Sequence, residues 1–558
     1  MQIIKNVFKF LIFILPLKIT AQSTYIQQGS KDYHFIDRME IKEVHNTDLN
    51  FSTLKPFNRK YILEEASLLD AKGNFSSLSK TDQYNLQSLY MNNNEWYSGS
   101  QTPFLSKKPV LKTFYKDKSN AFEVNTKDFF LAVNPVLHFR FGKEMDADKN
   151  IYLNSRGITL RARIANKIGF SSTIIDNQER GPVFFQQEVN ELRAVPGVGF
   201  YKAFKNDPYA QDYFDGRGYF TFNATKYIDF QFGFDKNFIG NGYRSLFLSD
   251  WGNSYLFAKI NTRIWKFNYQ NLFMELMPRY KDIGNNLLRK KYAAMHHLSM
   301  NVTKSLNIGL FEGVMFGRSD HFEFEYLNPV IFYRHVEGTL GSPDNAVAGL
   351  DFKLNAKKHV QLYGQLLLDE FILSKIKNDP SNWVNKFGIQ LGAKYIDAFG
   401  INNLDLQVEM NRVRPFTYSH FDTINNYTHY NQPLAHPLGA NFQEWIGIVK
   451  YQPFPKWNFY ARTIYYYKGM DTANANFGGN IFKSYLTRLT DDGFNIGSGD
   501  KATCLNTLLN ISYEFKQNLF FEASIQNRNY KLNSGFSNNS TSFSAGIRLN
   551  IYKREYDF

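Results

Sequence analysis

Aromatic, arginine and histidine side chains gather in one stretch, Val413–Asn441, which reads "VRPFTYSHFDTINNYTHYNQPLAHPLGAN". Aromatic faces can stack on the C–H surfaces of sugars, and guanidinium and imidazole groups can bind carboxylates. The pattern therefore predicts a polysaccharide-binding loop, and the alternative is a loop that packs on itself and plugs the protein's interior. The binding candidates are Arg414, Phe416, Tyr418, His420, Tyr427, His429, Tyr430 and His436.

A second candidate lies in the stretch "FDKNFIGNGYRSLFLSD". Its glycines follow a strand pattern, but no helix pattern comes after them, and a phosphate-binding loop needs a helix whose N–H groups point at the anion. We interpret the stretch as a loop that folds back where larger side chains would crowd, with an arginine and a serine that bind sugar hydroxyls or carboxylates. The alternative is a structural loop whose arginine pairs with Asp235 or Asp250. We assign Gly240 and Gly242 as structural glycines, and Arg244 and Ser245 as polysaccharide-binding candidates.

Side chains that could bind a metal or catalyse a reaction lack the spacing that either task requires. Metal sites repeat their ligands at characteristic intervals, and covalent catalysis needs a nucleophile beside its base. We therefore predict no catalytic residue, no metal site and no cofactor. The sets considered are His420, His429 and His436 for a metal, Asp491, Asp492, Asn495 and Asp500 for calcium, and Ser419-His420 and Asp320-His321 for catalysis.

The N-terminus has the pattern of a secretory signal. Two lysines precede the apolar run Phe10–Leu17, and Ala21 offers a cleavage point, so we assign residues 1–21 to a cleaved signal peptide. The alternative, a membrane anchor, needs a longer apolar run. The formal charge of the chain is +14, and its single cysteine, Cys504, excludes a disulfide framework. A basic exported protein suits anionic partners such as lipopolysaccharide or acidic polysaccharide, and export argues against nucleic acid.

Composition and periodicity together predict a transmembrane β-barrel in the bacterial outer membrane. The chain has 53 Phe and 35 Tyr, yet its mean hydropathy is −0.41. This combination is expected where lipid-facing and lumen-facing residues alternate along each strand. Every second residue from Phe543 to Ile551 is apolar, which predicts a last strand, and Phe558 resembles the C-terminal assembly signal of outer-membrane barrels.

Eighteen such strands fit the chain, joined alternately by short and long links. This alternation is typical of barrels with short periplasmic turns and long outer loops. The nine long links include Lys143–Lys149, Ile175–Arg217 and Lys531–Thr541. The eight short links lie near Ala165–Lys167, Lys226–Tyr227, Arg263, Thr303–Ser305, Asn355–Lys358, Asp397–Asn403, Gln452–Lys456 and Lys516–Asn518.

The segment between the signal and the barrel, residues 22–127, has a helical pattern instead. The stretches "FNRKYILEEASLLDAKG" and "SKTDQYNLQSLYMNNNEW" each carry an apolar stripe, and the second opens with Ser79 and Asp82 in capping-box spacing. A third short helix is expected at Lys31–Lys42. We expect a small periplasmic helical bundle that closes the lower mouth of a barrel formed by residues 128–558.

These features resemble a known family, the Wzi-type capsule-assembly outer-membrane proteins. The resemblance rests on the helical segment with "YHFIDRMEIK", the eighteen strands and the loop "NRVRPFTYSHFDTINNYTHYNQPLAHPLGANF". "GNGYRSL" resembles a glycine-rich loop after an early strand of that family. The chain is most similar to the Bacteroidota branch that includes the gliding-motility protein RemB. The likeness covers nearly the whole mature chain and is strongest in Asn411–Phe442.

The resemblance implies a non-enzymatic protein that binds or attaches surface polysaccharide and, in the motility branch, supports adhesion and gliding. Two alternatives stay open: a porin-like diffusion channel, because barrels of this size can enclose a pore, and an accessory anchor subunit of a secretion or motility machine. The large loops and the helices favour closure over conduction. The expected partners are outer-membrane lipid, lipopolysaccharide and surface polysaccharide, with machinery proteins under the last alternative.

Overall fold

The computed structural model describes residues 23–558 except 74–77, 166, 206, 281–286, 319–320, 330–331, 342 and 371–372. The predicted signal peptide, residues 1–21, lies outside the described residues, and so does Asp320 of the weak catalytic pair. Within the described part of the chain, no helix is long and apolar enough to cross a bilayer. The division of the chain into residues 22–127 and 128–558 stays a prediction.

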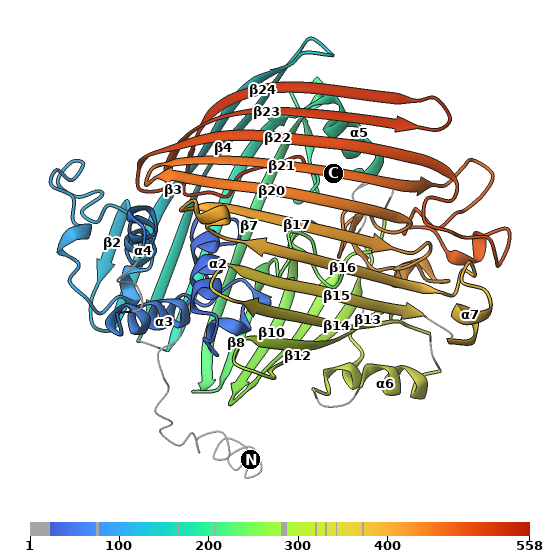
Figure 1. Cartoon of the computed structure of the whole chain (residues 1–558), viewed down its shortest axis with the longest axis horizontal. Helices are drawn as coiled ribbons and strands as arrows, with labels where there is room; N and C mark the ends of the chain where they lie inside the picture. Colours follow the sequence, from blue (N-terminus) through green and yellow to red (C-terminus); the bar gives the residue numbers. More distant parts are fainter. Residues whose placement is uncertain are drawn as a thin grey trace, which may run out of the picture.

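Eighteen antiparallel strands close into a barrel, which confirms the predicted fold class (Figure 1). Strand β24 pairs with β3 to complete the ring, from Leu549 opposite Leu137 to Ser542 opposite Glu144. The barrel strands are β3 (Phe129–Glu144), β4 (Lys149–Ile164), β5 (Ile168–Arg180), β7 (Asp207–Thr225), β8 (Ile228–Asp235), β10 (Tyr255–Ile264), β11 (Phe267–Leu276), β12 (Lys291–Asn301), β13 (Leu306–Phe316), β14 (Asn345–Ala356), β15 (Val360–Glu370), β16 (Lys386–Tyr395), β17 (Leu404–Val413), β20 (Phe442–Phe454), β21 (Trp457–Met470), β22 (Asp500–Lys516), β23 (Leu519–Leu532) and β24 (Ser537–Leu549).

Short elements decorate the ends and the interior of the barrel. The short strands are β1 (Leu54–Lys55), β2 (Phe122–Asn125), β6 (Lys202–Phe204), β9 (Phe238–Ile239), β18 (Thr428–His429) and β19 (Gln432–Pro433). The helices are α2 (Asp32–Glu43), α3 (Arg59–Ala71), α4 (Lys80–Asn92), α5 (Val183–Leu192), α6 (Tyr333–Thr339) and α7 (Leu373–Asn378), with 3₁₀ turns at Leu49–Phe51, Asn94–Trp96, Thr102–Phe104, Phe324–Leu327, Ala398–Gly400, Thr423–Asn425 and Tyr485–Thr487.

Each strand separates an apolar outer face from an inner face, because successive side chains point to opposite sides of a strand. In β24, Phe543 and Ile547 are exposed, whereas Ser542 is buried; in β3, Phe139 is exposed, whereas His138 is buried. A band of exposed large apolar side chains is unfavourable in water, and lipid covers such a band in outer-membrane barrels. The outer face of the barrel is therefore its lipid-facing surface.

Two of the predicted long links are tight turns. Residues 145–148 join β3 to β4, and residues 533–536 join β23 to β24. The sequence pattern placed the ends of these strands where the apolar alternation stops, but backbone pairing continues further because the ladder needs only N–H and C=O groups. Strand β7 has 19 residues, more than the roughly 9–11 that cross a bilayer, so part of the wall projects beyond the membrane. The link predicted at Ile175–Arg217 is shorter and contains α5.

The predicted continuation of the last strand to Ile551 is wrong. Strand β24 ends at Leu549, and residues 551–558, which we call the inner segment, turn into the barrel. Phe558 therefore does not end a barrel strand. Four of these eight residues are charged at pH 7, and charged side chains are costly on a lipid-facing strand, which explains why the segment leaves the sheet.

The inner segment crosses the lumen. The hydroxyl of Tyr552 donates to Asp215 Oδ2 of β7 at 3.0 Å, whereas Glu555 forms an ion pair with Arg462 of β21, well around the ring of strands. The C-terminal end accordingly lies within the outline of the barrel in Figure 1.

The largest apolar core also lies inside the barrel. It joins inward side chains of the wall, such as Met295 and Ile446, to Leu246, Tyr418 and Leu434 of two long links. Polar inward residues surround this core along the remaining strands. The interior is thus packed with protein, and the two long links supply much of that packing.

The N-terminal helices close the end of the barrel where the short links lie. Ile36, Leu63 and Leu89 of the three helices share one apolar cluster. The hydroxyl of Ser79 accepts a hydrogen bond from the N–H of Asp82 at 3.0 Å, as the capping-box spacing predicts. The same hydroxyl donates to the side chain of Asn403 in a short link at 2.7 Å.

Arg38 of α2 ties the helices to the barrel rim. Its buried guanidinium donates twice to Asp82 of α4 at 3.0 Å, once to Asp397 at 2.8 Å, and once to Asp405 of β17. Burial alone would raise the pKa of Asp82 and Asp397, but Arg38 and Lys42 outweigh it and lower both pKa values below the usual range. The cluster is therefore fully charged at neutral pH.

Arg38→Ala is expected to loosen the helices, because it leaves three buried carboxylates without their main cation. Removing one partner of a buried ion pair typically costs about 3–5 kcal/mol. The measurement is the rate at which a protease cleaves residues 23–96 in the folded, detergent-solubilised barrel.

The wild-type helices should also loosen in acid. The lowered pKa values of Asp82 and Asp397 stabilise the folded state at any pH above the ordinary carboxylate pKa. This stabilisation is lost as pH falls through the lowered pKa values and the carboxylates become protonated.

The control is Lys143→Ala, whose ammonium pairs with Asp148 of the four-residue turn between β3 and β4, both side chains being at least half exposed. This substitution should change little, because an exposed ion pair in a turn contributes little to stability. Equal protease resistance of the Arg38→Ala protein and wild type would contradict the proposed role of the cluster.

Candidate functional site

The two stretches singled out by their sequence pack against each other inside the barrel. We call residues 236–254 the glycine loop and residues 414–441 the aromatic loop. The hydroxyl of Tyr418 donates to Leu246 O and that of Tyr427 to Phe247 O, both at 2.7 Å. The N–H of Ser249 donates to Leu434 O at 2.9 Å. Two loops distant in sequence are thus joined by direct hydrogen bonds as one internal body.

The other aromatic candidates of the aromatic loop pack on neighbouring loops. Phe416 is fully buried, with its ring 4.8 Å from that of Phe494 and 6.4 Å from that of Trp383. Tyr430 is only partly buried and lies edge-on to Tyr280, with ring centroids 5.0 Å apart. Of the aromatic side chains in this set, Tyr430 retains the most accessible surface.

The three histidines of the aromatic loop are buried separately. His429 accepts from the N–H of Met277 and donates to Ser254 O, both at 3.1 Å, and burial lowers its pKa to about 3. His436 lies 2.7 Å from Glu444, and burial lowers the pKa of its imidazole too. Burial and Lys386 likewise lower the pKa of His420. Within the described ranges, no three His, Cys, Asp or Glu side chains are arranged to hold a metal ion.

The two candidate arginines are held by groups of the chain itself. Arg414 donates to the carbonyl oxygens of Asn385 at 3.1 Å and Asn382 at 3.3 Å. Arg244 donates to Asp557 Oδ2 at 2.7 Å and lies 3.5 Å from Glu444. The alternative partners expected from sequence, Asp235 and Asp250, are thus wrong, because the nearest acids come from parts of the chain that only the fold brings close.

The glycines of the glycine loop sit where a larger residue would collide. A Cβ on Gly242 would lie 2.4 Å from Glu409 Oε2, and one on Gly240 would lie 3.1 Å from Gln365 Nε2. The hydroxyl of Ser245 donates to Ile239 O at 2.5 Å. Lack of room for a side chain therefore explains why glycine occupies positions 240 and 242. Ser245 forms its hydrogen bond within the glycine loop.

Nine of the ten binding candidates are buried, Tyr430 being the one that is partly accessible. In this conformation they shape the interior of the barrel, and direct contact with polysaccharide stays a prediction for them. The sequence alternative of a self-packed loop describes their present geometry.

A cavity of about 550 Å³, the outer cavity, lies at the end of the barrel that carries the long links. Its walls come from α5, the start of the link between β11 and β12, the link between β21 and β22, the ends of β21, β22, β23 and β24, and the edge of the aromatic loop. Gln187, Arg279 and Phe536 on its rim are exposed, so the cavity opens to solvent. Its charged and aromatic lining consists of Arg279, Lys468, Lys483, Arg528, Glu188, Glu191, Asp471, Phe184, Tyr466, Phe482, Tyr530, Phe536 and Phe558.

Cations lie beside aromatic rings in the outer cavity. The guanidinium of Arg528 lies 4.7 Å from the ring centroid of Phe184 and 4.9 Å from that of Tyr530. Arg279 lies 5.1 Å from the ring centroid of Phe482. Aromatic rings beside fixed guanidinium groups can bind a sugar that carries an acidic substituent, with the ring against the sugar and the guanidinium on the acid. The residue types that the sequence analysis weighed in the aromatic loop thus also line the outer cavity.

The acids of the outer cavity balance part of its positive charge. Asp471 pairs with Lys483 at 2.9 Å. Burial, together with the neighbouring Glu191, raises the pKa of Glu188 on α5 to about 7. Glu188 therefore changes its charge near neutral pH, and the net charge of the cavity changes with it.

Sequence reasoning missed most of this site. Helix α5 lay within a predicted loop, although "VFFQQEVNEL" has adjacent phenylalanines that now pack on the inner segment, with Phe184 5.9 Å from Phe558. Arg528 and Tyr530 lay within a predicted strand, where two residues of the same face carry a cation and a ring. This pairing of Arg528 and Tyr530 was the sequence feature that could have indicated a binding site on the inner face of the strand.

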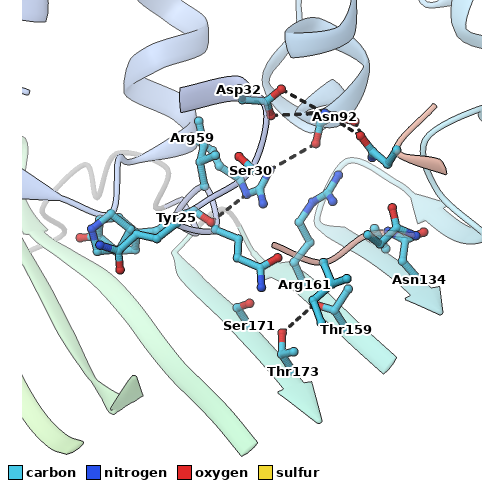
Figure 2. A pocket seen from close by; sticks show the side chains of 18 of the residues that line it. Tyr25, Ser30, Asp32, Arg59, Asn92, Asn134, Thr159, Arg161, Ser171 and Thr173 are labelled. Carbon is cyan, nitrogen blue, oxygen red and sulfur yellow. Dashed lines mark hydrogen bonds between the residues drawn. The ribbon is translucent and has the colours of Figure 1, made fainter. Parts of the chain in front are cut away.

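A smaller inner cavity of about 150 Å³ lies at the helix end (Figure 2). Figure 2 shows Asp32 and Arg59 of the N-terminal segment facing Arg161 and Ser171 of the strands. Its arginines are engaged: Arg59 donates to Tyr25 O at 3.1 Å, and Arg161 pairs with Glu95 at 3.0 Å. The outer cavity is larger and has an exposed cation, Arg279, on its rim, and it is the stronger candidate site.

Comparisons with known proteins agree with the barrel and its helices. The family model of the capsule assembly protein Wzi matches residues 216–533, more than half of the 558 residues. A solved structure of Wzi, an outer-membrane protein involved in group 1 capsule assembly in Escherichia coli and described as a carbohydrate-binding β-barrel, is similar in fold. Its TM-score is 0.55, with 13% identity, over 96% of this chain and 100% of that chain.

Other outer-membrane structures match less of the chain. OprD of Pseudomonas aeruginosa has a TM-score of 0.42 at 11% identity and covers 75% of this chain and 94% of its own. OccAB4 of Acinetobacter baumannii has a TM-score of 0.41 at 11% identity and covers 76% of this chain and 98% of its own. No curated protein sequence matched the chain.

Proposed function

The chain belongs to the family of the capsule assembly protein Wzi, and from this premise we propose that it is a non-enzymatic outer-membrane barrel that binds or organises surface polysaccharide. The observation that carries the proposal is the outer cavity, where the exposed Arg279 lies beside Phe482 and the buried Arg528 lies beside Phe184 and Tyr530. Its site is built for an acidic glycan segment of a few sugar rings.

The packed interior favours a binding role over a diffusion channel. Inside the barrel, Arg244 of the glycine loop pairs with Asp557 of the inner segment and lies 3.5 Å from Glu444 of β20, and Tyr418 joins the aromatic loop to the glycine loop. A channel would need a continuous aqueous path past these groups. We therefore place the porin-like alternative second.

We propose that the end with the outer cavity faces the cell exterior and that the helices face the periplasm. The long links gather at the first end and the short links at the second, as in outer-membrane barrels of known topology. Lipopolysaccharide would then surround the outer rim, and residues 1–21 would be removed on export. This orientation puts the outer cavity where surface polysaccharide is.

We extend the proposal to capsule attachment, adhesion and gliding motility, as in the RemB branch of the family. The support is the resemblance of Asn411–Phe442 to that branch. An anchoring role for secretion or motility proteins is the alternative for the same barrel.

The double variant Arg279→Ala with Tyr530→Ala is expected to weaken binding of an acidic polysaccharide about tenfold or more. A charge-assisted hydrogen bond contributes about 1.5–3 kcal/mol, and 1.4 kcal/mol corresponds to tenfold in affinity. The measurement is titration of the purified barrel with the acidic polysaccharide of its own cells, together with polysaccharide retention and cell spreading of the variant strain.

A matched control is Lys202→Ala with Tyr209→Ala. This pair also removes one cation and one ring from exposed positions of the same end, but outside the outer cavity. If both double variants bind as tightly as wild type, the outer cavity is not the site. If binding falls but spreading is unchanged, the polysaccharide role stands and the motility extension fails.

Binding of an acidic polysaccharide is expected to strengthen as pH falls from about 8 to about 6. Glu188, with a pKa of about 7, becomes neutral in this range and no longer repels the ligand, while sugar carboxylates stay ionised as Asp and Glu do. Glu188→Gln should bind tightly throughout and remove the pH dependence. An unaltered pH profile in this variant, measured by the same titration, would contradict the role of Glu188.

A further inference from the structure

A short hairpin between α4 and β2 displays apolar side chains on the surface at the helix end. We call residues 104–118 the basic hairpin. Leu105, Val110, Leu111 and Phe114 are 54%, 53%, 80% and 42% exposed. Single exposed apolar residues are ordinary, but four within ten positions form a patch that marks an interaction site.

The basic hairpin is a fixed structure. Phe104 at its base is buried in the helical core, with its ring 5.4 Å from that of Tyr97. The N–H of Lys118 donates to Phe104 O at 3.0 Å, and that of Val110 donates to Phe114 O at 2.8 Å. Its turn holds Leu111 at a φ of 49°, a strained conformation for a large side chain. The fold therefore presents Leu111 outwards at an energetic cost.

The same hairpin is strongly basic. Its single acidic residue, Asp117, is buried and accepts hydrogen bonds from Ser119. Its lysines are all exposed, and they are Lys107, Lys108, Lys112, Lys116 and Lys118. Apolar tips set among lysines are typical of segments that lie in the headgroup region of an anionic bilayer.

The position of the basic hairpin adjoins the lipid-facing wall. Strand β2 directly follows it and pairs with β3, from Phe122 opposite Val133 to Asn125 opposite Phe130. It uses the same edge of β3 that β24 leaves free beyond Leu137. Figure 1 shows β2 at the helix end of the barrel with the light-blue hairpin projecting beside it. The hairpin thus emerges from the rim of the membrane-spanning wall.

Exposed apolar residues of the wall continue up to this rim. Phe122 of β2, Phe129 of β3, and Ile164 and Ile168 at the β4–β5 turn are all more than a third exposed. Strand β2 therefore joins the basic hairpin to a rim whose exposed apolar residues lie on the lipid-facing surface.

We propose that the basic hairpin inserts its apolar tip into the phospholipid leaflet that faces the periplasm, with its lysines on anionic headgroups. Its lysines disfavour a protein partner, because lysine is depleted from the cores of protein interfaces. Long lysine side chains can instead extend to phosphates while their methylene stems stay in the apolar layer. The inference goes beyond polysaccharide binding and uses the orientation proposed above.

A nitroxide label on Leu111→Cys tests the insertion in the full-length barrel reconstituted in phosphatidylcholine vesicles with and without phosphatidylglycerol. The native Cys504 is buried, so the label is selective. The matched control is Leu68→Cys on α3, an equally apolar residue of the helix end that is 53% exposed. Collisions of each label with oxygen and with a water-soluble nickel chelate report its depth.

The expected result is a several-fold higher ratio of oxygen to nickel collisions at position 111 than at position 68, with a further rise when phosphatidylglycerol is present. Changing Lys107, Lys108, Lys112 and Lys116 to glutamine should remove the rise that phosphatidylglycerol causes and leave the barrel folded, since all four are exposed.

Equal nickel access at positions 111 and 68 would overturn the insertion. Insertion that ignores phosphatidylglycerol, or that the glutamine variant leaves unchanged, would overturn the role of the lysines. Immobilisation of the label in cell envelopes but not in vesicles would assign the hairpin to a protein or peptidoglycan partner and also overturn the proposal. None of these outcomes depends on polysaccharide binding, so that function is tested separately.

Discussion

Pairing of buried charges inside the barrel is the constraint on which the rest of the structure depends. A closed barrel turns many polar side chains inwards, and a buried charge without a partner is costly. Here the partners come from segments that fold into the lumen. Arg244 of the glycine loop meets Asp557, and Arg554 of the inner segment lies 3.3 Å from Glu179 of β5. Arg38 does the same for the helices at the other end.

This pairing fixes protein segments inside a barrel of a size that can enclose a pore. The charges fix the inner segment and the glycine loop, and the aromatic loop buries Tyr418 and Tyr427 against the glycine loop. Helix α5 in turn rests on Tyr556 and Phe558 of the inner segment. The outer cavity is the space left between α5 and the aromatic loop, so its shape depends on the packing below it.

Much of the barrel could be read from the sequence because lipid imposes a strict period of two on the wall. The strand number, the short links and the N-terminal helices follow from local patterns, and the cap of α4 at Ser79 follows from residue type and spacing. Strand ends were less predictable, because β3, β4, β23 and β24 continue their backbone pairing beyond the apolar band. Residues 551–558 were misplaced for a similar reason: Ile551 continues the alternation, while the charges that follow it decide the path.

The candidate site was harder to predict because the partners of its residues are distant in sequence. Nothing near Arg244 indicates that Asp557 is its partner, and nothing near Arg528 indicates that Phe184 lies beside it. The chemistry expected of the aromatic loop was a reasonable reading of its residue types, yet those types serve equally well to fill an interior. Whether these side chains are buried depends on the closed barrel around them, so their burial cannot be predicted from the loop sequence alone.

The conductance of the purified full-length protein in planar bilayers tests the central claim most directly. A lumen filled by charge-paired segments should give insertion without steady ionic current, and adding acidic polysaccharide should change nothing in that current. A large, steady open-channel conductance in the intact protein would contradict the account, because it would require a continuous aqueous path past Arg244 and Asp557.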